Sequence, residues 1–160
     1  MNVDAPVLEL PAASEWALRR RQLGASVALA NGCFDLLHVG HVRYLVAAAA
    51  EADALVVGIN DDATVALLKG PSRPLLPAAV RAEMVAALRC VDMVTIFGDR
   101  TADRLIRELR PDVHCKGTDY VHGVPEAPTV ESVGGRIAIV GDAKRHSTGE
   151  LIDRLRPTDP

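Results

Sequence analysis

The sequence contains few aromatic residues: Phe, Trp and Tyr make up only 3% of its 160 residues, whereas apolar residues make up 49%. A buried core must therefore be aliphatic, and a chain of this length is long enough to form one. The net charge of −3 argues against the strongly basic surface that nonspecific nucleic-acid binding needs, so we expect no nucleic-acid partner. An anionic ligand must instead be met by a local group of positive side chains.

Cysteine is also scarce, and the three cysteines are scattered at Cys33, Cys90 and Cys115. An odd, dispersed set does not indicate a disulfide framework and favours a reducing compartment. The first residues lack the basic and then apolar order of a signal peptide. No apolar run approaches the roughly 18 residues of a membrane helix. We therefore expect a cytoplasmic protein without a membrane partner.

Two common phosphate-binding loops are absent. No G-x-G-x-x-G fingerprint follows the first apolar run, and no segment ends in the Gly-Lys-Ser/Thr of a P-loop. Instead, Gly32 and the sequence His38-Val39-Gly40-His41 stand between the apolar run 27–30 and the helix-like segment 39–52. Free N–H groups and the dipole at a helix start attract anions, and a glycine lets a ligand approach the backbone. This turn is therefore a candidate phosphate site.

Short apolar runs alternate with helix-like segments along the chain. This spacing predicts βαβ units and a parallel sheet, and the continuous apolar runs are typical of strands covered on both faces. We predict an α/β fold, a Rossmann-like doubly wound parallel sheet in a single three-layer domain over residues 13–156, with a flexible N-terminal arm at 1–12 and a tail at 157–160. The expected strands are 27–30, 54–59, 93–97, 112–115 and 136–140, and the expected helices are 14–23 (capped by Ser14), 39–52, 61–68, 78–89, 102–109 and 147–156.

Polar residues follow several of these strands. In such sheets, ligands bind at the carboxyl ends of the strands, near the point where the strand order reverses. Asn60 follows the second strand, the segment 116–119 follows the fourth and the segment 144–148 follows the last. We therefore expect these loops and the histidine turn to open on one edge of the sheet.

The same residues resemble a known family. The H-x-G-H sequence at 38–41 resembles the signature of the nucleotidyltransferase superfamily, in its cytidylyltransferase-like group. Segment 68–74 is similar to the Lys-Gly…Arg-Pro loop of the heptose branch of that superfamily, and Arg81 stands where the family has an arginine. The likeness spans roughly residues 14–156, and further segments match in the same order, at 111–120, 130–136 and 146–148.

The resemblance implies transfer of AMP from ATP to a sugar 1-phosphate with release of pyrophosphate. The expected acceptor is D-glycero-β-D-manno-heptose 1-phosphate and the product is ADP-heptose. ATP and the sugar phosphate are the implied partners, Mg²⁺ is the implied cofactor, and a homodimer is expected by analogy alone. The implied site residues are His38, His41 and Lys69 for catalysis, Gly32, Phe34, Asp35, Gly40, Asn60, Arg81, Ser147 and Thr148 for the nucleotide, Lys116, Asp119 and Arg145 for the acceptor, and Asp35 for the metal.

Three positions depart from the heptose branch. Thr118 replaces the second glycine of Lys-Gly-Gly-Asp-Tyr, Gly149 replaces the last residue of Ser-Thr-Thr, and residues 144–146 are more basic than expected. These changes leave the acceptor open. One alternative is a CTP-dependent cytidylyltransferase that acts on glycerol 3-phosphate or an aminoalcohol phosphate. An alternative of another class is a nucleotide-binding module without turnover.

Two of the implied site residues also have simpler interpretations. Arg81 could be an ordinary surface arginine that pairs with Glu83 or Asp62, and such a pair would contribute little to stability. Ser147 could be a helix N-cap, with Glu150 completing a capping box. A cap and a phosphate site are compatible, because both use the same free N–H groups.

Overall fold

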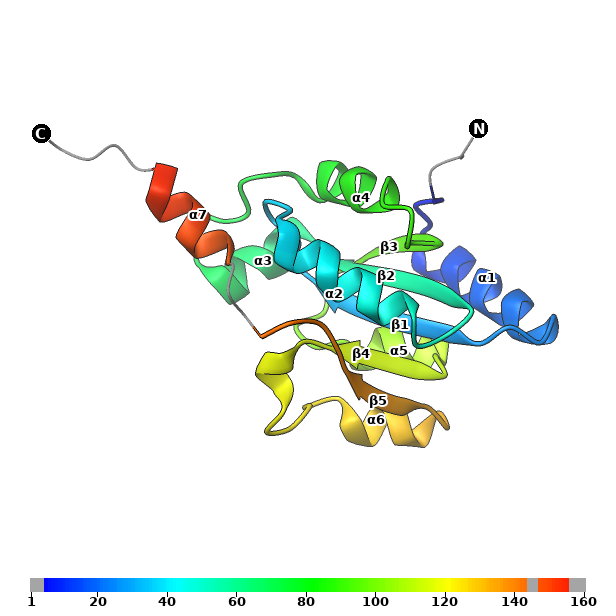
Figure 1. Cartoon of the computed structure of the whole chain (residues 1–160). Helices are drawn as coiled ribbons and strands as arrows, with labels where there is room; N and C mark the ends of the chain where they lie inside the picture. Colours follow the sequence, from blue (N-terminus) through cyan, green and yellow to red (C-terminus); the bar gives the residue numbers. More distant parts are fainter. Residues whose placement is uncertain (1–4, 144–146, 156–160) are drawn as a thin grey trace, which may run out of the picture.

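The structure, a computed structural model of the chain, describes residues 5–143 and 147–155. Five strands form one sheet in the order β3-β2-β1-β4-β5, and every neighbouring pair is parallel. The order reverses between β1 and β4, which is the switch point of a doubly wound sheet. The predicted Rossmann-like α/β fold is thus confirmed (Figure 1). The strands are β1 (Val27–Gly32), β2 (Ala54–Asn60), β3 (Met93–Phe97), β4 (Val113–Lys116) and β5 (Arg136–Ile139).

Helices cover both faces of the sheet (Figure 1). Because successive side chains of a strand point to opposite faces, β1 contributes Ala28 and Ala30 to one core and Val27 and Leu29 to the other. The helices are α1 (Leu10–Gln22), α2 (Val39–Ala49), α3 (Asp62–Lys69), α4 (Ala78–Ala86), α5 (Asp103–Leu109), the 3₁₀ helix η1 (Thr118–Tyr120), α6 (Ala127–Ser132) and α7 (Thr148–Leu155). Within the described residues, no helix is both long and apolar enough to cross a membrane.

The beginning of the described chain lies along β3. The backbone N–H of Val94 donates to the carbonyl of Pro6 at 2.9 Å, and the N–H of Leu8 donates to the carbonyl of Val94 at 2.9 Å. Helix α1 then starts at Leu10, whereas the sequence pattern predicted a start at Ser14. Pro11 lies in the first turn, where a proline is compatible with a helix start. The Ser14 hydroxyl donates to the carbonyl of Glu108 on α5 at 2.7 Å instead of capping a helix.

The other expected elements are present, β3 with the predicted bounds 93–97 and the rest with shifted ends. Helices α2 and α4 both stop earlier than the sequence pattern suggested, at Ala49 and Ala86. Strand β1 continues to Gly32, and α2 begins at Val39, so the turn between them occupies only residues 33–38. A short turn of this kind brings the histidines directly to the carboxyl end of β1.

Candidate active site

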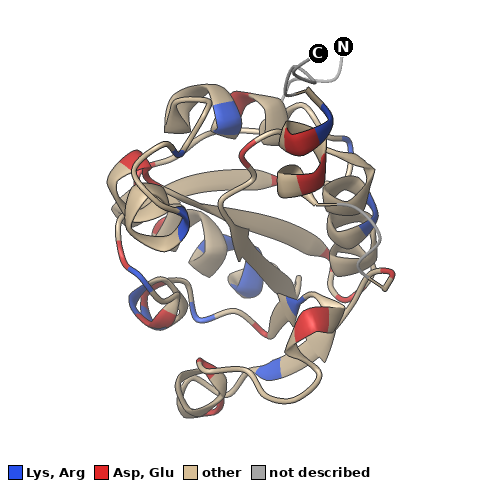
Figure 2. Cartoon of the chain, turned by 90° about the vertical axis from the view of Figure 1, so that its left-hand side faces the viewer, with Lys and Arg blue, Asp and Glu red and all other residues tan. Residues whose placement is uncertain are grey.

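A cleft of about 640 Å³ opens at the carboxyl edge of the sheet. Figure 2 views the molecule from this edge, where lysine, arginine and acidic residues lie on the surrounding loops and helices. The loops after β1, β2, β4 and β5 all reach the cleft, as expected from the topology. The predicted site residues that line it are Gly32, Phe34, Asp35, His38, Gly40, His41, Asn60, Lys69, Lys116, Asp119, Ser147 and Thr148.

The two histidines are held by the backbone of their own turn. His38 caps α2, and its Nδ1 accepts the N–H of Gly40 at 3.1 Å. Nδ1 of His41 accepts the N–H of His38 at 3.4 Å, and the two rings stack with their centroids 3.8 Å apart. A ring whose Nδ1 accepts a hydrogen bond is neutral and carries its proton on Nε2. Nε2 is therefore the ring nitrogen of each histidine that carries a donor hydrogen.

A strained backbone places these rings. Phe34 and Leu36 both have positive φ, at 48° and 62°, which is uncommon for residues with side chains and is typical of functional turns. The Phe34 ring is 4% exposed and packs edge-on against His41 with centroids 5.2 Å apart. Although Phe34 was predicted to bind the nucleotide, its ring mainly supports His41 from the core side.

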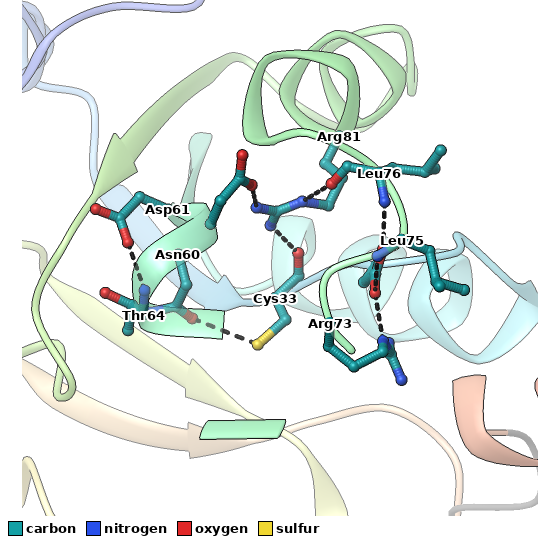
Figure 3. A network of polar contacts seen from close by, with 10 residues as sticks. Cys33, Asn60, Asp61, Thr64, Arg73, Leu75, Leu76 and Arg81 are labelled. Atoms are coloured by element: carbon teal, nitrogen blue, oxygen red, sulfur yellow. Dashed lines mark hydrogen bonds and ion pairs between the residues drawn. The ribbon is translucent and has the colours of Figure 1, made fainter. Parts of the chain in front are cut away.

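The carboxylate of Asp35 fastens the loop that precedes α4. It accepts hydrogen bonds from Nε of Arg73 at 2.6 Å and from the N–H groups of Leu75 and Leu76 (Figure 3). Burial raises the pKa of Asp35, but the hydrogen bonds from Leu75, Arg73 and Leu76 outweigh it and hold the pKa below its usual value. The expected role of Asp35 as a Mg²⁺ ligand does not fit, because these donors already use its oxygens. Within the described residues, no group of three or more His, Cys, Asp or Glu side chains could hold a metal.

Arg81 lies behind the cleft and does not line it, contrary to the expectation that it contacts phosphate. Its side chain is 1% exposed and donates to the carbonyls of Cys33 and Leu76 and to the carboxylate of Asp62 (Figure 3). The pairing with Asp62 was anticipated, although the guanidinium is buried and not at the surface. Arg81 thus joins the histidine turn, the start of α3 and the loop before α4.

Positive side chains gather at the β2–β3 side of the cleft. Lys69 ends α3, and among the described residues it has no ion-pair partner. Arg73 and Arg100 also line the cleft. The sequence analysis missed both as site residues: Arg73 lay within the Lys-Gly…Arg-Pro likeness, whereas no motif marked Arg100. Burial raises the pKa of the Cys33 thiol despite the charge of Lys69 nearby, so this cysteine stays protonated at neutral pH.

A buried polar network forms the opposite wall. The ammonium of Lys116 lies 3.2 Å from Oδ1 of Asn31 and 3.2 Å from Oε1 of Glu126. It also lies 4.8 Å from the centroid of the Tyr120 ring. Burial raises the pKa of Glu126, but the charge of Lys116 and the hydrogen bonds from Lys116 and from backbone N–H groups together outweigh it. The pKa therefore lies below its usual value, and the carboxyl group is ionised at neutral pH. Sequence reasoning missed Glu126, because it is ten residues from Lys116 in a long loop.

The start of α7 closes the cleft beside Asp35. The expected capping box is present: the N–H of Glu150 donates to Oγ of Ser147, and the N–H of Ser147 donates to Oε2 of Glu150, both at 3.2 Å. The Thr148 hydroxyl donates to the carbonyl of Asp35 at 3.3 Å. Arg145, predicted to bind the acceptor, lies outside the described residues.

These features define the class of protein. A parallel sheet of order 3-2-1-4-5, with a cleft at its switch point lined by histidine and lysine donors, is typical of proteins that bind nucleotides. The chain belongs to the cytidylyltransferase-like family, because a sequence model of that family matches residues 29–154. The membership that the H-x-G-H sequence suggested is thus confirmed.

Curated relatives are similar over most of this chain. It is 49% identical over 133 residues to bifunctional protein HldE of Geobacter metallireducens, covering 82% of this chain and 27% of the relative. It is 48% identical over 151 residues to bifunctional protein HldE of Acidiphilium cryptum, covering 94% of this chain and 31% of the relative. The chain therefore spans less than a third of the length of these relatives.

A solved structure has the same fold. The crystal structure of the lipopolysaccharide core biosynthesis protein from Thermoplasma volcanium GSS1 superposes with a TM-score of 0.62 at 24% identity. The match covers 75% of this chain and 100% of that chain. At this identity the likeness concerns the fold alone.

Proposed function

We propose that this protein transfers AMP from ATP to D-glycero-β-D-manno-heptose 1-phosphate, forming ADP-heptose and pyrophosphate. Two observations support the acceptor: the likeness of segments 68–74 and 111–120 to the heptose branch, and the 49% and 48% identity to bifunctional HldE proteins. Membership of the cytidylyltransferase-like family supports the reaction class.

The geometry of His38 and His41 carries the proposal. In the reaction, an oxygen of the acceptor phosphate forms a bond to the α-phosphorus of ATP. The bond from that phosphorus to the bridging oxygen breaks, and pyrophosphate leaves with the electron pair. Negative charge builds on the phosphoryl oxygens, so catalysis depends on positioned donors more than on proton transfer. Two imidazoles whose Nδ1 atoms accept backbone N–H groups place such Nε2–H donors at the cleft.

The remaining donors fit the rest of the triphosphate. Lys69, with no carboxylate partner in the described structure, supplies a positive charge from the end of α3. The start of α7, with Ser147 and Thr148, supplies N–H groups and hydroxyls for the β- and γ-phosphates. Asp35 does not fit as a metal ligand, so we infer that Mg²⁺, when bound, would be held mainly by ATP itself and would supply positive charge to its phosphates. Asp119 and Arg145 remain candidates for the acceptor.

The proposal is tested by incubating the full chain with Mg²⁺, one nucleoside triphosphate and one phosphorylated acceptor at a time. The acceptor panel contains heptose 1-phosphate, other sugar 1-phosphates, glycerol 3-phosphate and aminoalcohol phosphates, and pyrophosphate release is measured. We expect release with ATP and heptose 1-phosphate, and ADP-heptose in the mass spectrum. Release only with CTP and glycerol 3-phosphate would replace this acceptor by the alternative one. Nucleotide binding without release for any pair would favour a binding module.

A further inference from the structure

The buried ion pair between Lys116 and Glu126 calls for a functional explanation. Both side chains are 6% exposed, and both line the cleft. The free energy gained by pairing two buried charges is largely offset by their desolvation, so an apolar pair of similar volume would stabilise the fold equally well. A pair of this kind at the wall of a binding cleft is therefore better explained by ligand recognition than by stability.

The hydrogen bonds around this pair have a fixed direction. A lysine ammonium only donates, so the Asn31 atom that faces it at 3.2 Å is the amide oxygen. Nε2 of His114 lies 3.0 Å from the same oxygen and must therefore also donate. His114 is fully buried, and this burial, helped by the charge of Lys116, lowers its pKa to about 4, which keeps the ring neutral. Asn31 and His114 thus hold the ammonium in one place.

Within the ion pair itself, one donor of Lys116 and one acceptor of Glu126 remain unused by the described residues. Lys116 has three ammonium hydrogens and makes two hydrogen bonds, to Asn31 and Glu126. Oε2 of Glu126 is buried and has no hydrogen-bond partner in the described part of the chain. Oε1 of Glu126 also accepts the N–H of Ala102 at 3.4 Å. The terminal torsion of a glutamate is soft, so a turn of the carboxylate can bring Oε2 to a ligand beside Lys116, and the contacts of Oε1 with Ala102 and Lys116 then change with it.

The unused ammonium hydrogen of Lys116 and the unused Oε2 of Glu126 together match one chemical group better than others. A hydroxyl both donates and accepts, whereas an ionised phosphate oxygen only accepts and would be repelled by Glu126. The pair also carries no net charge, in contrast to Lys69 on the other side of the cleft. We propose that Glu126 and Lys116 together bind a sugar hydroxyl, and that Glu126 is a specificity-determining residue of this cleft.

This inference rests on the proposed function, which supplies two sugars: the ribose of ATP and the ring of the sugar 1-phosphate. Both present hydroxyls of the same chemistry. A hydrogen bond to a charged group accounts for roughly a 10- to 100-fold difference in affinity. The ligand that uses the pair should therefore bind the wild-type protein about 10- to 100-fold more tightly than its analogue lacking that hydroxyl.

The experiment measures affinities by calorimetry with the full chain, so it needs no turnover. One arm compares ATP with 2′-deoxy-ATP and 3′-deoxy-ATP, and the other compares heptose 1-phosphate with its monodeoxy analogues. The test variant is Glu126→Gln, because the amide NH₂ next to the ligand replaces an acceptor by a donor. The control is Glu51→Gln, which alters the exposed pair of Glu51 with Arg136 away from the cleft. A double variant, Lys116→Met with Glu126→Met, replaces the pair if the single variant does not fold.

We expect one arm to show the hydroxyl preference in the wild type and in Glu51→Gln, and its loss in Glu126→Gln or in the double variant. The arm that responds identifies the sugar. Equal affinity for every parent and analogue in the wild type, or an unchanged preference in the Glu126 variants, would overturn the inference. If this happened while pyrophosphate was released normally, only the inference would fail. A hydroxyl preference without pyrophosphate release would instead contradict the proposed function. Binding of neither ligand would overturn both.

Discussion

The burial of His114 should make the stability of the protein depend on pH in a window that can be calculated. The ring is fully buried, and its pKa is lowered from 6.5 to about 4, by burial and then by the charge of Lys116. The unfolded chain therefore binds a proton near pH 6.5 that the folded chain does not bind until about pH 4. Stability is full above pH 6.5 and falls as the pH drops through this window, since protons favour the unfolded state.

The size of this loss follows from the two pKa values. One pKa unit corresponds to about 1.4 kcal/mol. With values of 6.5 and about 4, the free energy of unfolding should fall by about 2 kcal/mol between pH 7 and pH 5, and by about 3 kcal/mol at pH 4. Well below pH 4, His114 should cause no further loss of stability, because its ring is then protonated in both the folded and the unfolded state.

The assay is urea unfolding at pH 7, 6, 5 and 4, with the wild type and His114→Gln. A glutamine can still donate to Asn31 but does not titrate. Other histidines and the carboxylates contribute equally to both proteins, so the difference between the two curves isolates His114. We expect the variant to lose about 2 kcal/mol less than the wild type between pH 7 and pH 5. Parallel curves over this range would refute the assignment of a buried neutral histidine.

Three further substitutions test the packing of the domain by the same urea assay, two of them beside the cleft and one, Gly135→Ala, at the opposite edge of the sheet. Asp35→Asn should lower the free energy of unfolding by about 3 kcal/mol, since it leaves the Arg73 guanidinium and two backbone donors without their carboxylate; a change below about 0.5 kcal/mol would contradict this. Arg81→Met should cost about 3 kcal/mol, because buried carbonyls lose their donors; a neutral result would mean that Arg81 is not a structural link. Gly135→Ala should cost about 1–3 kcal/mol, as a Cβ there would lie 2.5 Å from the carbonyl oxygen of Pro111; unchanged stability would show that this contact relaxes freely.

The fold could be predicted from the sequence because its signals are local. The apolar run at 54–59 is β2, buried along its whole length, and the expected helix at 61–68 is α3, shifted by one residue. The predicted start of α1 at Ser14 was wrong. Serine is a common helix cap, but here Ser14 lies within a helix that begins at Leu10, and its hydroxyl donates to the carbonyl of Glu108. Its partner is far away in the sequence, so no local pattern could reveal it.

The site was predicted in part for the same reason. The histidine turn and Lys69 sit in short motifs, and the topology alone brings them to one edge. Arg81 was misplaced, because its burial depends on carbonyl groups of two turns whose paths the sequence does not specify. Glu126 was missed because only the folded loop brings it to Lys116. The cleft residues that were predicted lie in short motifs, whereas the positions of Arg81 and Glu126 depend on tertiary contacts.

The most direct test of the central claim is the turnover of His41→Ala with ATP, Mg²⁺ and heptose 1-phosphate. If the Nε2–H of His41 stabilises charge on the reacting phosphates, its removal should lower kcat about 100- to 1000-fold. The matched control is His122→Ala, whose exposed ring lies outside the cleft and should leave kcat unchanged. A His41→Ala variant that forms ADP-heptose at nearly the wild-type rate would contradict the account of the histidine turn.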